Sequence, residues 1–176
     1  MKNRLLITFL FLSFFTQANA QISGNIKKHK HNFTKAQQYF NNDNYEVAIR
    51  YYTDALENAP KDELLITALQ SFVERGFSKY SLDDFEGAMA DFNTVLYLIE
   101  YDKGRIKLGN ERGNLDMLRY LGNLDILKKL RAAAYFGKGV VYKETNNISE
   151  SCKNLTKAAN LGMKDSAYEA MEGCPY

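Results

Sequence analysis

The stretch Phe33–Pro60, FTKAQQYFNNDNYEVAIRYYTDALENAP, decides the fold. Its small and aromatic residues follow one another at helical spacing, in the order Ala36, Tyr39, Tyr45, Ala48, Tyr52, Ala55 and Pro60. Alanines about two helical turns apart share one helix face, where small side chains let two antiparallel helices approach closely. The Asn42-Asp43-Asn44 segment lies between the two expected helices, and its composition is typical of a tight turn and a helix N-cap. The stretch therefore predicts two antiparallel helices joined by a short turn.

The same order of residues recurs twice downstream. A second copy lies forty residues further on and consists of Gly76, Phe85, Ala88, Phe92 and Val95. A third, weaker copy consists of Gly139, Tyr142, Ile148, Ser151, Leu155 and Ala158. Repetition of this kind indicates helix pairs that stack on their neighbours and bury a continuous core.

This arrangement resembles the tetratricopeptide repeat, and the end of the third copy, Lys157–Ala167, resembles a Sel1-like repeat. The resemblance implies an all-α superhelix of about three helix pairs. We expect a repeat domain over 33–176, with repeats at about 29–62, 62–102 and 132–165, and a capping helix over 165–173. The first helix of the second pair is expected over Asp62–Tyr80.

An insertion over 103–131 separates the second and third copies. It contains two similar consecutive segments, which begin at Gly113 and Gly122. Each segment has leucines at helical spacing behind an asparagine that can cap a helix. We expect two short helices or one long kinked helix that adds packing rather than forming a lid.

The first twenty residues have the layout of a cleavable secretory signal. Two cations, Lys2 and Arg4, precede an apolar run that is too short to span a bilayer, and Ala18-Asn19-Ala20 follows. We expect an exported bacterial protein, periplasmic or secreted, with no stable membrane anchor after cleavage. Without residues 1–20 the chain has 21 basic and 21 acidic residues, so its charge gives no case for nucleic acid as a partner.

The segment 21–32 is expected to be a solvated basic arm, because it contains Lys27-Lys28-His29-Lys30-His31. These two histidines are the only ones in the chain, so a nucleophile–histidine pair is hard to assemble on the folded body. We expect no enzyme activity, no cofactor and no metal. The two cysteines, Cys152 and Cys174, are expected to form a disulfide in an oxidising compartment.

The resemblance also implies that the first helix of each pair lines a concave groove for a protein or peptide partner. The matching positions are Phe33, Gln37, Phe40, Val73, Phe77, Tyr80, Phe136, Val140 and Lys143. Because the set is largely apolar, burial under the insertion or the capping helix is an equal alternative to an open groove. A second functional hypothesis is a binder of a small envelope ligand, such as a glycan or lipid fragment, in a pocket formed with the insertion.

Overall fold

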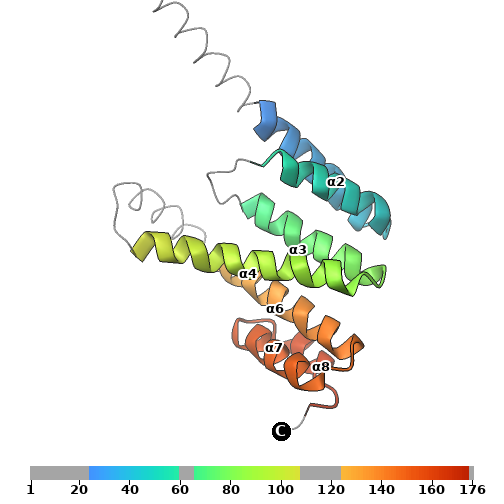
Figure 1. Ribbon diagram of the computed structural model, residues 1–176, viewed down its shortest axis with the longest axis vertical. Helices are drawn as coiled ribbons and strands as arrows, with labels where there is room; N and C mark the ends of the chain where they lie inside the picture. The colour runs from blue at the N-terminus through green and yellow to red at the C-terminus, as the bar shows by residue number, and fades with distance from the viewer. Residues whose placement is uncertain (1–23, 60–65, 108–123, 175–176) are drawn as a thin grey trace, which may run out of the picture.

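The computed structural model describes residues 24–59, 66–107 (with side chains as far as residue 100) and 124–174. The described residues form seven helices. These are the helix over 24–40, α2 (Tyr45–Glu57), α3 (Ile66–Ser81), α4 (Phe85–Lys107), α6 (Leu124–Glu144), α7 (Ile148–Asn160) and α8 (Lys164–Ala170). Consecutive helices pack as antiparallel pairs that stack from one end of the molecule to the other (Figure 1). The all-α solenoid expected from the sequence is confirmed.

The three turns inside the helix pairs have the same backbone geometry. Each contains one residue with a positive φ angle: Asp43 (56°), Asp83 (60°) and Asn146 (60°). Asp and Asn adopt this left-handed conformation more readily than other non-glycine residues. The next residue in each turn donates its N–H to a carbonyl five residues earlier, in the pairs Asn44–Tyr39, Asp84–Lys79 and Asn147–Tyr142. The turns therefore lie at equivalent positions of the three sequence copies.

Burial supports the same alignment of the three copies. Four equivalent positions, one on the first helix and three on the second, are buried in every copy: Ala36, Ala48, Tyr52 and Ala55, then Gly76, Ala88, Phe92 and Val95, then Gly139, Ser151, Leu155 and Ala158. The apolar position that follows each turn is less buried: Tyr45 and Phe85 are half-buried and Ile148 is exposed. The small residues of this set allow close helix approach, and the larger ones fill the space between the helices.

The ring of Phe92, on α4, packs at the point where three helices meet. A Cβ atom on Gly76 of α3 would lie 2.7 Å from Phe92 Cε1, and one on Gly137 of α6 would lie 2.3 Å from Phe92 Cζ. The Phe77 ring also packs against it edge-on, with centroids 5.0 Å apart. Two glycines therefore allow one aromatic ring to join the second helix pair to the third.

The N-terminal segment differs from the expected solvated arm. Residues 24–32 are helical and continuous with 33–40, and His29 is fully buried. Its Nδ1 donates to the Ala55 carbonyl oxygen (2.7 Å), and its Nε2 shares a hydrogen bond with the Thr67 hydroxyl (2.7 Å). The prediction of a solvated side chain is wrong for His29, because both ring nitrogens find partners inside the fold, whereas His31 is exposed.

The ends of the expected insertion continue the flanking helices. α4 extends to Lys107, and α6 begins at Leu124, upstream of the expected third repeat. Leu127 and Leu130 are buried in the same core cluster as Phe92, so this part of the insertion contributes packing. The Gly113 segment of the internal duplication, together with residues 108–123 as a whole, lies outside the described residues. So do residues 62–65, where the first helix of the second pair was expected to begin.

A disulfide closes the C-terminal end. Cys152 of α7 bonds to Cys174, which follows α8, and their Cα atoms are 5.7 Å apart. The pairing expected from the sequence is confirmed. The bridge holds the segment after α8 against α7. Ala167 of α8 is buried in a cluster with Ala158 and Ala159 of α7.

We predict that Gly137→Ala lowers the free energy of unfolding by about 1–3 kcal/mol, because the added methyl group overpacks the Phe92 ring. Gly24→Ala is the matched control, since nothing lies within 4 Å of a Cβ atom there. Urea denaturation of both variants checks the prediction. Equal stability of Gly137→Ala and the wild type would contradict the packing described here.

Loss of the disulfide should also destabilise the chain. In the loop-closure description, a cross-link spanning 22 residues contributes about 3 kcal/mol, so Cys152→Ala/Cys174→Ala should lose about that much. Thermal or urea unfolding measures the loss, and the reduced wild type serves as the control. Thiol reagents should label the purified protein after reduction only; labelling without reductant would show that the bridge is absent.

Candidate protein-interaction surface

The nine predicted partner-binding positions lie on the first helices of the three pairs, which are the helix over 24–40, α3 and α6. Two of them are core residues. Phe33 is 8% exposed and Val73 is 5% exposed. Phe33 packs against Tyr52, with ring centroids 6.3 Å apart. The structure therefore leaves neither side chain accessible to a partner.

Three of the predicted positions connect the second pair to the third. Phe77 packs on Phe136 across the pairs, with ring centroids 6.3 Å apart. The Tyr80 hydroxyl donates to Glu144 Oε1 (3.3 Å). Burial and the neighbouring Glu144 carboxylate raise the pKa of Tyr80, which keeps its hydroxyl protonated and able to donate. These side chains hold the stack together and remain half-buried.

The two polar members of the set are also engaged. Gln37 donates to Glu74 Oε1 (3.3 Å) and so links the first pair to the second. Lys143 donates to the carbonyl oxygen of Ala170 (3.0 Å), at the end of α8. A cation at this position satisfies a helix C-terminal carbonyl, so Lys143 holds the capping helix against α6.

Five of the nine predicted positions, including the three that connect the second pair to the third, are apolar and half-buried, and they lie on the three first helices. We name this set the aromatic row; its members are Phe40, Phe77, Tyr80, Phe136 and Val140. Each side chain has one part packed on the fold and another part open to solvent. The sequence identified these positions, but it did not distinguish them from the buried Phe33 and Val73.

A cluster of hydrogen bonds centred on Glu74 of α3 was not predicted from the sequence. Its carboxylate accepts from the Tyr52 hydroxyl, from Gln37 Nε2 and from Gln70 Nε2 (3.1 Å). Burial, reinforced by the hydrogen bond to Glu74, strongly raises the pKa of Tyr52. One carboxylate thus connects the first helix, α2 and α3.

A second buried cluster is centred on Asp91 of α4. Asp91 accepts from Arg75 Nε (2.9 Å), Arg75 Nη2 (2.6 Å) and Lys79 Nζ (2.9 Å). Arg75 also donates to the Thr53 hydroxyl (2.9 Å) on α2. A sequence signal was present: two cations one turn apart on α3, and an acidic residue beside the core residue Phe92 on α4.

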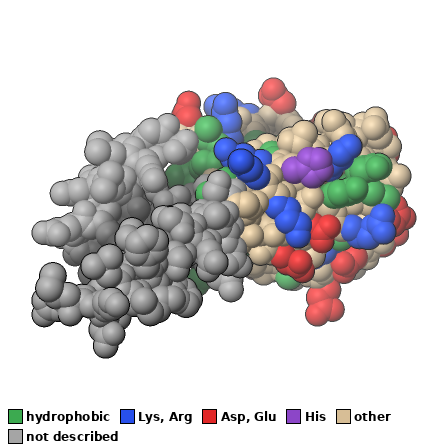
Figure 2. Space-filling model, turned by 90° about the horizontal axis from the view of Figure 1, so that it is seen from above, with side chains coloured by type: hydrophobic (Ala, Val, Ile, Leu, Met, Phe, Trp, Pro, Cys, Tyr) green, Lys and Arg blue, Asp and Glu red, His purple; other side chains and the backbone are tan. Residues whose placement is uncertain are grey.

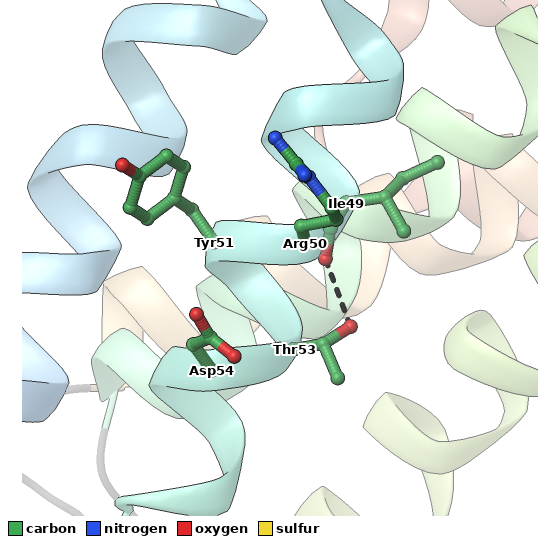
Figure 3. A pocket seen from close by; sticks show the side chains of 5 residues that line it. All are labelled: Ile49, Arg50, Tyr51, Thr53 and Asp54. Carbon is green, nitrogen blue, oxygen red and sulfur yellow. Dashed lines mark hydrogen bonds between the residues drawn. The ribbon is translucent and has the colours of Figure 1, made fainter.

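A hollow of about 470 Å³ lies on α2, away from the aromatic row. It is lined by Ile49, Arg50, Tyr51, Thr53 and Asp54, and the Thr53 hydroxyl donates to the Ile49 carbonyl oxygen (2.8 Å; Figure 3). The described lining residues contain no nucleophile paired with a base. Within the described part of the chain, no group of three or more His, Cys, Asp or Glu side chains is arranged to hold a metal ion.

The tetratricopeptide repeat family model matches residues 24–62, which span the helix over 24–40 and α2. A tetratricopeptide repeat occupies this part of the chain. That family is generally non-catalytic, and no catalytic family is found. No curated protein matches the chain. The likeness of the third copy to a Sel1-like repeat stays a prediction.

The tetratricopeptide match begins at residue 24, nine residues before the expected start of the domain at 33. It therefore includes the buried His29 and agrees with the helix seen there. In the described ranges, no helix is long and apolar enough to cross a bilayer.

We predict that Asp91→Ala lowers the free energy of unfolding by about 3–5 kcal/mol, because it leaves Arg75 and Lys79 without their buried counter-ion. Glu150→Ala is the control, since it breaks an ion pair with Lys153 that is solvent-exposed, and it should change stability little. Urea denaturation of both variants measures the difference. Similar stabilities for the two would show that the Asp91 cluster does not support the fold.

Proposed function

We propose that this chain is a non-catalytic interaction scaffold that binds a peptide or protein partner along the first helices of its pairs. The aromatic row is the observation that carries the proposal. Stacked helix pairs present such helices on one continuous surface, and the tetratricopeptide repeat at 24–62 makes this the expected use of the scaffold.

The half-buried side chains of the row suit this role. Each ring or aliphatic group is held in place by the fold on one side, so little conformational entropy is lost when a partner covers the other side. Phe40, Tyr80 and Val140 lie on the three successive first helices. An extended or helical segment with apolar anchors, laid across these helices, would meet all three in turn.

The proposed setting is the cell envelope or the medium. The N-terminal layout of residues 1–20 and the Cys152–Cys174 bridge both support export, because disulfides persist in oxidising compartments. We propose that the partner is met there, after removal of the signal.

A small-ligand site at the insertion has less support. The hollow beside this segment measures about 230 Å³, and its described lining is Ile99, Leu124, Asp125, Leu127, Lys128, Arg131 and Leu161. Small-molecule pockets are usually about 300–1,000 Å³ and rich in aromatic side chains. No aromatic residue is among the described lining, so the interaction scaffold remains the better hypothesis.

Val140→Glu tests the proposal, because Val140 belongs to the aromatic row but not to the core clusters. We expect cross-linking in intact cells, followed by purification, to recover a partner with the wild type and to lose it with Val140→Glu. Ile148→Glu is the matched control: Ile148 is 39% exposed at the start of α7, outside the row. Phe77 is avoided because it packs on Phe92.

Both variants should have the melting temperature of the wild type. This measurement shows whether each variant is folded. The same proteins cross-linked by wild type and Val140→Glu would exclude the aromatic row as the binding surface. Loss of cross-linking by both variants would equally contradict a site confined to the row.

A further inference from the structure

Cations follow one side of α6 and the adjacent side of α7. Residues 126–143 contain five Lys or Arg and no acidic residue, and residues 151–164 contain three lysines and no acidic residue. α6 and α7 are antiparallel neighbours, so the two stretches lie side by side (Figure 1). Four of these cations lie close together around Tyr135 and Glu150, and we name them the basic patch: Arg131 and Lys138 of α6, and Lys153 and Lys157 of α7.

Two cations of the patch share one aromatic ring. Arg131 Cζ lies 5.9 Å from the centroid of the Tyr135 ring, and Lys157 Nζ lies 5.1 Å from it. The electron-rich ring attracts both cations, but it has no net charge and leaves their positive charges uncompensated. Neither cation forms an ion pair with an acidic residue of the described ranges. An anion that binds here therefore has no carboxylate to displace from these two groups.

Lys138 is a third cation beside this ring, and it is half-buried. Its ammonium group donates to Asn93 Oδ1 of α4 (2.7 Å), which is a neutral acceptor. Burial lowers the pKa of Lys138, and the positive charge of Lys157 lowers it further, whereas Tyr135 and Glu150 act in the opposite direction. The protonated form of Lys138 is therefore less favourable than that of an exposed lysine, and a bound anion would stabilise it.

The Glu150 carboxylate lies among the lysines of the patch. It accepts a hydrogen bond from Lys153 Nζ (2.7 Å). This hydrogen bond lowers the pKa of Glu150, and the positive charges of Lys153, Lys157 and Lys138 lower it further. One carboxylate offsets one of the three lysine charges, so the lysines keep an excess of positive charge.

The other acidic residues of this region lie at its margins. On α4, the exposed Glu86 and Glu100 lie seven residues before and after Asn93, about two helical turns away in each direction. Asp91 of α4 is buried and paired with two cations of α3. Three further acids lie just beyond the two cationic stretches, and they are Asp125, Glu144 and Asp165. Among the described residues, Glu150 is therefore the acid that lies within the patch.

We propose that the basic patch binds a phosphate-bearing ligand, with the phosphate group beside Tyr135. Guanidinium and ammonium groups both donate to phosphate oxygens, and a doubly charged phosphate offsets the excess positive charge of the patch. The patch is separate from the aromatic row, because Lys138 lies two residues from both Phe136 and Val140, about half a turn around α6. This ligand site does not depend on the surface proposed for a protein partner.

NMR titration of the isotope-labelled protein with inorganic pyrophosphate tests the proposal. Sodium chloride keeps the ionic strength constant, so that charge screening does not change during the titration. We expect saturable shifts of the amide signals around Tyr135, Lys138 and Lys157. Lys138→Gln/Lys157→Gln should weaken binding about tenfold or more, because the variant loses two charge-assisted hydrogen bonds to the phosphate oxygens.

Lys27→Gln/Lys30→Gln is the matched control, because it removes the same number of positive charges from exposed positions of the first helix. Acidic and basic side chains are interspersed on that end of the molecule (Figure 2). This control should bind pyrophosphate like the wild type. A wild type without saturable shifts, or equal affinities of the two double variants, would overturn the proposal. Lys157→Gln alone, at an exposed position, repeats the comparison if the double patch variant does not fold.

Vesicles distinguish the two sources of a phosphate group, which are a soluble compound and a lipid headgroup. Sedimentation of the wild type with phosphatidylglycerol vesicles, reversed by pyrophosphate and absent with phosphatidylcholine vesicles, would identify a headgroup. Binding of pyrophosphate without such sedimentation would identify a soluble compound. Either result supports the phosphate site, provided that Lys138→Gln/Lys157→Gln loses the same binding.

Discussion

The close approach of α3 and α6 to the Phe92 ring is the contact on which the stack depends. The ring takes the space that side chains at Gly76 and Gly137 would otherwise fill, and so it belongs to two helix pairs at once. The first pair is joined differently, through polar groups. His29 reaches from the first helix to the end of α2 and the start of α3, and Glu74 gathers donors from three helices.

These two kinds of junction have different physical characters. The Phe92 ring is held between two glycines by van der Waals packing alone. A small displacement of the ring therefore breaks no hydrogen bond. The Glu74 and Asp91 clusters require directed donors, and each buried polar group without its partner would be costly. In the described residues, every buried side-chain nitrogen and oxygen has a partner. The relative position of the first and second pairs is therefore more tightly restricted than that of the second and third pairs.

Much of the fold could be predicted from sequence because the signal is local. Residues such as Ala48, Ala88 and Ser151 occupy equivalent positions, and a helix pair needs a small side chain at each. His29 was misjudged because its neighbours in sequence are lysines, whereas its hydrogen-bond partners lie 26 and 38 residues away. Phe33 and Phe40 share one helix face, yet Phe33 alone lies deep in the core; that difference arises from tertiary packing, which spacing does not encode.

Among the described helices, most contacts run between helices that are close in the chain: α2 packs on α3, α3 on α4, α4 on α6, α6 on α7 and α7 on α8. Longer contacts link the first helix to α3, through His29 and Gln37, and α3 to α6. Such low contact order favours fast folding and lets parts of the molecule open separately. A chain that emerges N-terminus first can therefore pack each new helix on a surface already formed. The Cys152–Cys174 bridge joins α7 to the segment after α8, so it can close only after both helices have been made.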